Sequence, residues 1–199
     1  MPRSARRIYQ REIYHILNRG NARQNLFSSS EDFTAYLSLI ARYKVKYSVT
    51  IFHYCLMDNH THFLMRGETS DEAITRLMHD VQTAYAGHYR KNGERTGHVF
   101  ENRFKNFHIE KDSYLLECGR YIERNPVRAG MVKSPGLYLW SSFRYYAFGA
   151  PDPLVTENPI YREMGFSDVQ RRMHYIQYVE TPRAYEAIVD QFFKEKVVH

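Results

Sequence analysis

Cysteine is scarce in this chain, and long hydrophobic runs are absent. The two cysteines, Cys55 and Cys118, are too few for a disulfide framework or a four-thiolate zinc site, so both are expected to be small buried residues. No apolar run approaches the roughly 18 to 20 uncharged residues of a membrane span. The start, MPRSARRIYQRE, lacks the apolar middle of a secretory signal. We therefore expect a cytoplasmic protein that makes no contact with a membrane.

Internal repeats and low-complexity tracts are also missing. With 199 residues and 43% hydrophobic content, the chain is long enough to bury a core. These values fit one globular domain with an extension better than two small domains.

Acidic residues are in the minority, and the excess of positive charge is uneven. The formal charge is +6, and residues 1–23 hold six arginines against one acid, Glu12. The chain also contains 17 tyrosines and 12 phenylalanines. Cations neutralise phosphates and aromatic rings stack on unpaired bases, so this composition favours a nucleic-acid partner. A basic surface that is merely solvated remains the alternative.

Alternating and helical patterns follow one another along the first two thirds of the chain. Strands are predicted at 12–18, 48–57, 60–67 and 98–110, and helices at 28–47, 70–91 and 111–125. Asp58 and Asn59 have the composition of a tight hairpin turn, and Pro126 is expected to end the third helix. This order predicts an α+β fold, a ferredoxin-like βαββαβ antiparallel sheet with helices packed on it. Irregular structure and a last helix at 167–179 follow as a C-terminal extension.

Two histidines stand one residue apart in the strand at 60–67. Side chains of a strand alternate between faces, so His60 and His62 project from one face while Thr61, Phe63 and Met65 take the other. This pair can hold one metal ion, although a structural or exposed pair is also an ordinary use of such a motif.

Tyr121 and Asn125 are four residues apart in the predicted third helix and therefore share a face. A hydroxyl and an amide oxygen facing the same way can act on one phosphate, with the tyrosine as nucleophile and the amide as a third metal ligand beside His60 and His62. Two imidazoles and an amide suit Mg²⁺ or Mn²⁺, and the choice between these ions stays open. Packing for Tyr121 and a helix end for Asn125 are the alternatives.

Five ordered motifs carry a resemblance to a known family. They are YHILNRGN at 14–21, YCLMDNHTHFLM at 54–65, GHVFENRFKNF at 97–107, YIERNPVRAGMV at 121–132 and WSS at 140–142. With these motifs the chain resembles the single-tyrosine HUH transposases, and within them the REP-associated tyrosine transposases. The resemblance covers most of residues 8–146 and implies a transposase domain at 1–146 followed by an extension at 147–199 packed on it.

The resemblance implies a metal-dependent endonuclease and strand transferase that acts on single-stranded DNA. Hairpins of repetitive extragenic palindromes are the implied substrate, and the reaction forms a 5′-phosphotyrosine and frees a 3′-hydroxyl without ATP. His60 and His62 match the metal-binding pair, Tyr121 the nucleophile and Asn125 the ligand one helical turn later. Thr61 departs from the family pattern, because the middle residue of the motif is usually hydrophobic. A bacterial, nucleoid-associated protein that is a monomer or a homodimer is implied.

Basic residues near these motifs are candidates for contact with DNA. They form three groups, which are Arg19, Asn21 and Arg23 after the first strand, Arg103 and Lys105 on the fourth, and Arg120, Arg124 and Arg128 around Tyr121. A solvated charged face is the alternative for each of them. In the last helix, Arg171 and Arg172 stand beside Tyr175 and Tyr178, so this helix either grips DNA or closes the core.

Two other functions fit parts of this pattern. A domesticated protein would bind palindromic hairpins without cutting them, but such a protein is expected to lose a ligand or the tyrosine, and this sequence retains all four residues. Ferredoxin-like sheets with exposed aromatic residues also bind RNA. No aromatic motif of the kind found in RNA-binding RNP sequences is present on the predicted strands. The DNA enzyme is therefore the favoured hypothesis.

Overall fold

The predicted strands and helices are present in the computed structural model, which describes residues 8–91, 97–110 and 112–181. Within these residues there are four strands and five α-helices, with short 3-10 helices between some of them. They are β1 (Ile13–Arg19), η1 (Asn21–Arg23), α1 (Ser30–Lys46), β2 (Val49–Met57), β3 (His60–Gly67), α2 (Ala73–Lys91), β4 (Lys105–His108), α3 (Asp112–Arg128), η2 (Pro135–Leu137), α4 (Phe143–Phe148), η3 (Pro159–Met164) and α5 (Asp168–Glu180).

The four strands form one sheet in the order β2-β3-β1-β4, and each neighbouring pair is antiparallel. This is the strand order of the ferredoxin-like βαββαβ unit, so the predicted fold class is confirmed. Asp58 and Asn59 make the turn between β2 and β3, as predicted. The β2–β3 ladder shifts register between Ile51 and His53. Such a bulge lets one strand turn an extra side chain toward one face.

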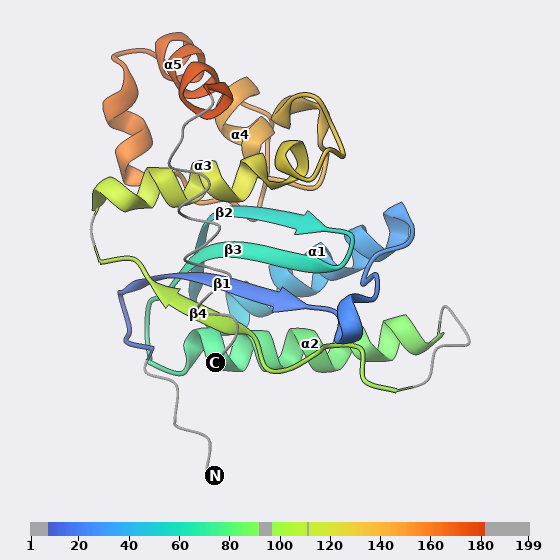
Figure 1. Cartoon of the computed structure of the whole chain (residues 1–199). Helices are drawn as coiled ribbons and strands as arrows, with labels where there is room; N and C mark the ends of the chain where they lie inside the picture. The colour runs from blue at the N-terminus through green and yellow to red at the C-terminus, as the bar shows by residue number, and fades with distance from the viewer. Residues whose placement is uncertain (1–7, 92–96, 111, 182–199) are drawn as a thin grey trace.

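Helices cover both faces of the sheet (Figure 1). On one face, α1 and α2 bury Tyr36, Leu77 and Val81 against strand residues such as Ile16 and Phe63. On the other face, α3 lies over β2 and β3, and its Leu115, Cys118 and Ile122 pack with Cys55 and Leu64. Both cysteines are buried and free, as expected from the sequence.

The predicted strand at 98–110 is shorter and irregular. Only Lys105–His108 forms β4, while Phe100 makes an isolated bridge to Gly20. Lys105 pairs with Leu17, and Phe100 pairs with Gly20. The four residues between Phe100 and Lys105 therefore stand opposite only two residues of the first strand segment, those between Leu17 and Gly20. The backbone bends at 101–103 to take up the excess, which an unbroken alternation of side chains did not reveal.

The prediction that Pro126 ends the third helix is wrong. Helix α3 continues through Pro126 to Arg128. A proline lacks the N–H that would bond to the carbonyl four residues earlier, here that of Ile122. The side-chain amide of Asn125 donates to this carbonyl at 3.3 Å and to that of Tyr121 at 2.9 Å. The vacant acceptor is thus occupied, and the helix tolerates proline in its last turn.

The C-terminal segment packs against α3 and the edge of the sheet. Residues 140–142 run along β2, with the Leu56 amide donating to the Trp140 carbonyl at 2.9 Å and the Ser142 amide to the Tyr54 carbonyl at 3.0 Å. Helix α5 buries Tyr175 and Val179 in the main core, so it closes the core as one of the two interpretations held. The rest of the predicted extension, from residue 182 onward, lies outside the described residues. Among the described residues, no helix is long and apolar enough to cross a membrane.

Candidate active site

The histidines of β3 project from the face of the sheet that α3 covers. Leu64, the next residue on that face, packs under α3, whereas Phe63 and Met65 pack on the opposite face. The ring centroids of His60 and His62 are 4.9 Å apart. Thr61 is buried on the opposite face, beside Tyr36 of α1. The strand alternation predicted from the sequence is therefore confirmed.

Helix α3 brings Tyr121 to these histidines. The Tyr121 ring meets the His62 ring edge-on, with centroids 6.0 Å apart and planes at 87°, and the tyrosine is 8% exposed. Gly119, one half turn earlier, lets the helix approach β2, because a Cβ at this position would lie 2.6 Å from His53 Nε2. Tyr114 on the same helix is 47% exposed. The structure thus combines the predicted nucleophile with the predicted ligand pair.

Two arginines accompany the tyrosine. The guanidinium carbon of Arg128 lies 5.1 Å from the centroid of the Tyr121 ring, and Arg19 of β1 stands directly opposite His60 in the β1–β3 ladder. Burial raises the pKa of the Tyr121 hydroxyl, while the charge and hydrogen bond of Arg128 and the charge of Arg19 act to lower it. Both cations therefore favour the phenolate, the form in which a tyrosine attacks best.

Burial keeps the two histidines neutral. It lowers the pKa of His60 to about 4, with the charge of Arg19 adding to the effect. Burial also lowers the pKa of His62 well below its ordinary value, and the neighbouring His60, His15, Arg19 and Arg128 act in the same direction. A neutral imidazole is the form that binds a metal ion.

The donor set fits a divalent ion in part. His62 Nε2 is buried and has no hydrogen-bond partner among the described residues, which is the condition expected of a nitrogen reserved for a ligand. Within residues 8–91, 97–110 and 112–181, no group of three or more His, Cys, Asp or Glu side chains is arranged to hold a metal. Any ion here would therefore rely on the two imidazoles together with an amide, water or phosphate oxygen.

Asn125 lies one turn after Tyr121, as the spacing requires. Its amide nitrogen is bonded to the helix carbonyls of Tyr121 and Ile122. Since nitrogen and oxygen leave the amide carbon in opposed directions, these bonds turn Oδ1 away from the helix backbone. Its service as a third ligand stays a prediction.

Comparison with known proteins identifies the family. The model of a family described as "Transposase IS200 like" matches residues 9–125, more than half of the chain. The chain belongs to the IS200-like transposase family. No match was found among curated proteins. The resemblance to single-tyrosine transposases is therefore confirmed at the level of this family.

Two solved structures resemble this chain. The chain is similar to a structure of a REP-associated tyrosine transposase bound to a REP hairpin, with 17% identity, a TM-score of 0.64, and coverage of 78% of this chain and 92% of that one. It is also similar to a putative transposase from Deinococcus radiodurans R1, with 14% identity, a TM-score of 0.42, and coverage of 62% and 97%. The first of these likenesses supports the transposase fold.

Three of the predicted DNA-contact residues lie beside the candidate site. Residues directly opposite one another in an antiparallel ladder share a face. Lys105, Leu17 and His62 therefore form one row across β4, β1 and β3, and Arg19 and His60 form the next. Arg128 lies over Tyr121. Arg19, Lys105 and Arg128 thus surround the histidines and the tyrosine with positive charge.

The remaining predicted contact residues lie elsewhere. Asn21 and Arg23 belong to η1 after β1, and Arg23 and Arg103 are exposed. Arg120 and Arg124 are buried and donate to main-chain carbonyls at the end of α5, Arg120 Nε to Tyr178 at 2.9 Å and Arg124 Nη1 to Val179 at 2.8 Å. Their placement gives no support to a role in phosphate binding, because these guanidinium groups cap a helix C-terminus instead.

Two groups near the site were not singled out from the sequence. His15 on β1 contacts His62, with His15 Nε2 2.8 Å from His62 Nδ1. Glu123 on α3 is fully buried, and it accepts from Ser142 Oγ and Tyr175 OH, both at 2.6 Å, and lies 2.9 Å from His53 Nδ1. His15 lies in the quoted YHILNRGN motif and Ser142 in WSS, but only the strand register and the helix packing reveal what each one contacts.

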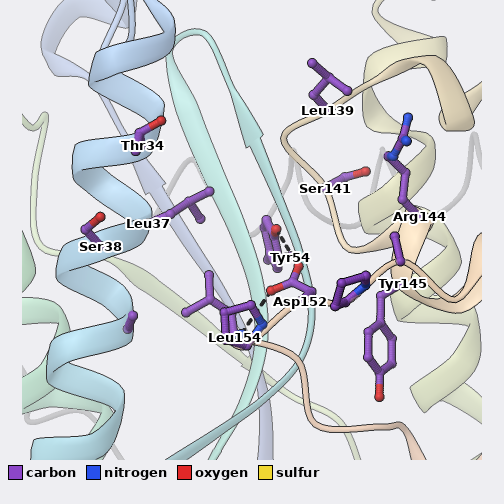
Figure 2. Close-up of a pocket in the computed structure, with 14 residues that line it drawn as sticks. Thr34, Leu37, Ser38, Tyr54, Leu139, Ser141, Arg144, Tyr145, Asp152 and Leu154 are labelled. Carbon is purple, nitrogen blue, oxygen red and sulfur yellow. Dashed lines mark hydrogen bonds between the residues drawn. The ribbon is translucent and has the colours of Figure 1, made fainter.

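A hollow elsewhere on the transposase is separate from this site (Figure 2). It lies between α1 and residues 139–154, and its lining includes none of the predicted site residues. Figure 2 shows Tyr54 pointing to Asp152, and the two are hydrogen-bonded at 2.8 Å. Asp152 also accepts from the Leu154 amide at 2.9 Å. This carboxylate therefore supports the local loop.

Proposed function

We propose that this transposase cuts and rejoins single-stranded DNA at hairpins through a covalent link to Tyr121. The observation that carries the proposal is the contact between the buried Tyr121 ring and His62, whose ring centroids are 6.0 Å apart, beside the neighbouring His60. A nucleophile, a pair of neutral imidazoles and three cations on one face are the components that phosphodiester transfer requires.

In the proposed reaction the Tyr121 oxygen attacks the phosphorus of a phosphodiester. The bond from Tyr121 Oη to phosphorus forms while the bond from phosphorus to the 3′ oxygen breaks, and the leaving oxygen takes up a proton as a free 3′-hydroxyl. Attack by that or another 3′-hydroxyl reverses these steps and releases the tyrosine. The link conserves the phosphodiester energy, so the exchange needs no ATP.

His60 and His62 are the residues proposed to hold a divalent ion, Mg²⁺ or Mn²⁺, with Asn125 as a candidate third ligand. Such an ion would act as a Lewis acid on a nonbridging phosphate oxygen and would orient the phosphate. Arg128 acts on the nucleophile itself, since its charge and hydrogen bond lower the pKa of the Tyr121 hydroxyl against the effect of burial.

Hairpin DNA is the proposed substrate, and both the sequence motifs and a solved structure of similar fold support it. The chain carries the five ordered motifs that resemble REP-associated tyrosine transposases, and a solved structure with the same fold is described as bound to a REP hairpin. Arg19 and Lys105 lie on adjacent strands of the site face, where they can neutralise phosphates next to the cleavage point.

The proposal is tested by incubating end-labelled single-stranded hairpins with the transposase and Mn²⁺ or Mg²⁺, followed by a denaturing gel. We expect a covalent protein–DNA band that disappears in Tyr121→Phe, while hairpin binding is retained. Tyr114→Phe is the matched control, since it makes the same change on the same helix at an exposed position.

Two results of this experiment favour other functions. Hairpin binding with no adduct in either metal supports a protein that binds palindromes without cutting them. Equal binding of an RNA version of the same hairpin supports an RNA partner instead.

A further inference from the structure

Each histidine of the candidate site has its Nδ1 atom in contact with a second residue. His60 Nδ1 lies 2.6 Å from the side-chain oxygen of Asn59, and His62 Nδ1 lies 2.8 Å from His15 Nε2. An imidazole has two ring nitrogens, so the nitrogen left over for a ligand is Nε2 in both cases.

The Asn59 contact fixes the tautomer of His60. The Asn59 amide nitrogen donates to the Arg23 carbonyl at 3.2 Å, so the amide oxygen must be the atom that faces His60. An amide oxygen only accepts hydrogen bonds. His60 Nδ1 therefore carries the proton, and Nε2 presents its lone pair.

The loop after β1 holds Asn59 in this orientation. Besides the side-chain bond to Arg23, the Asn59 carbonyl accepts from the Gly20 amide at 2.8 Å. A Cβ at Gly20 would lie 2.2 Å from the Gln24 carbonyl oxygen, so only glycine permits this turn. Arg23 adopts a positive φ of 62°, which is uncommon for a residue with a side chain. The loop after β1 thus contacts Asn59 through both Gly20 and Arg23.

The contact between His15 and His62 completes the arrangement. One of the two facing nitrogens must donate and the other accept. If His15 donated, the proton of His62 would sit on Nε2, the nitrogen that the proposed function assigns to the ion. A metal ion binds the lone pair of an unprotonated ring nitrogen. With the ion at His62 Nε2, His62 therefore donates from Nδ1 to His15 Nε2.

We propose that Asn59 and His15 are positioning residues that hold His60 and His62 in the Nδ1–H tautomer, so that both Nε2 atoms face one divalent ion. This inference rests on the proposed function in assigning the ion to His60 and His62. Partners of this kind fix the ring orientation of metal-binding histidines, and their loss typically weakens metal binding about 10- to 100-fold.

The first test is independent of metal. Long-range ¹H–¹⁵N NMR spectra of the metal-free protein at neutral pH report which ring nitrogen of each histidine is protonated, with assignments from His60→Gln and His62→Gln. We expect both histidines as Nδ1–H. Asn59→Ala shifts His60 toward a mixture of tautomers, while Asn59→Asp, which keeps an accepting oxygen, retains Nδ1–H. Protonation at Nε2 of His60 in the unaltered protein overturns the proposal.

The second test measures Mn²⁺ affinity by calorimetry. Asn59→Ala and His15→Leu are expected to weaken binding about 10- to 100-fold, while His15→Gln, which can place an amide oxygen at the position of Nε2, restores most of the affinity. Asp58→Ala is the matched control, because this exposed side chain belongs to the same turn.

The outcomes separate the two proposals. Unchanged Mn²⁺ affinity in Asn59→Ala and His15→Leu overturns the positioning role even if metal binding itself is confirmed. If the unaltered protein binds no Mn²⁺, the metal part of the proposed function fails, while the tautomer spectra still decide whether Asn59 and His15 set the two rings.

Discussion

At the scale of single residues, the site combines neutral imidazoles with a tyrosine whose ionisation is opposed by burial. Burial lowers the pKa of His60 to about 4 and that of His15 to about 3. Both histidines are therefore neutral at neutral pH, and His60 is in the form that binds a metal ion. Because burial lowers these pKa values, it also makes the stability of the folded protein depend on pH.

We expect the unfolding free energy of the metal-free protein to fall as the pH is lowered from about 6.5 toward 4. An unfolded histidine has a pKa of about 6.5, so the unfolded chain binds more protons than the folded one in this window, and acid favours unfolding. Urea unfolding in EDTA over this range measures the effect, and His15→Leu should flatten the curve. A variant curve parallel to that of the unaltered protein contradicts this explanation.

The sequence predicted which residues lie together when their position follows from the regular spacing within a single strand or helix. Alternation along a strand placed His60 and His62 on one face, and helical spacing placed Tyr121 with Asn125. It did not predict that Arg120 and Arg124 donate to carbonyls at the end of α5. These two arginines also share a helical face, but their hydrogen bonds depend on α5 packing against α3. His15 escaped notice for the same reason, since its contact with His62 runs diagonally across two strands.

At the scale of elements, helix α3 is positioned by contacts on more than one of its faces. Gly119 sits against His53 of β2, and Glu123 receives hydrogen bonds from Ser142 and from Tyr175 of α5. Tyr121, Arg128 and Asn125 occupy a different face. The position of Tyr121 beside the histidines therefore depends on packing at other faces of α3.

Gly119→Ala should destabilise the protein by about 1–3 kcal/mol through overpacking against His53, since the new Cβ would lie 2.6 Å from His53 Nε2. Gly87→Ala in α2 is the matched control, because a Cβ there meets nothing within 4 Å. In this second helix the same change should stabilise by about 0.5–1 kcal/mol. Urea unfolding measures the unfolding free energy of both variants. If both substitutions change this free energy in the same direction, the packing proposed for α3 is contradicted.

Tyr175→Phe should lower the unfolding free energy by about 1.5–3 kcal/mol, because it removes a hydrogen bond to a buried carboxylate. The bond is the 2.6 Å contact from Tyr175 OH to Glu123. Tyr114→Phe makes the same change at an exposed position and should have little effect. Equal stability of the two variants in urea shows that the Glu123 network does not anchor α5.

Element prediction succeeded where local patterns decide the structure. Ser29 accepts from the Asp32 amide at the start of α1, with Glu31 and Asp32 in its first turn, which are signals visible in the sequence. It failed at β4 and at Pro126. The bend at 101–103 depends on the neighbouring strand, and the helix beyond Pro126 depends on an amide that replaces the missing bond.

At the scale of the whole molecule, the chain carries a formal charge of +6, and Arg19, Lys105 and Arg128 place three cations at one face of the sheet. If DNA binds across Arg19, Lys105 and Arg128, the logarithm of the hairpin association constant should fall linearly with the logarithm of salt concentration. We expect Arg19→Gln to reduce this slope by about 1. Arg124→Gln should leave the slope unchanged, because Arg124 is buried against α5. Fluorescence titrations at several salt concentrations provide the comparison, and the reverse ranking contradicts the proposed DNA face.

The measurement that tests the central claim most directly is the location of DNA on the protein after reaction with a hairpin. Trypsin cleaves after Lys111, Arg120 and Arg124, so Tyr114 and Tyr121 fall in the separate peptides 112–120 and 121–124. Nuclease digestion, trypsin and fragmentation mass spectrometry then read the attachment site. The proposed function predicts a phosphonucleotide on Tyr121, including in a peptide with missed cleavage after Arg120. A nucleotide on Tyr114, or no modified tyrosine in either metal, contradicts it.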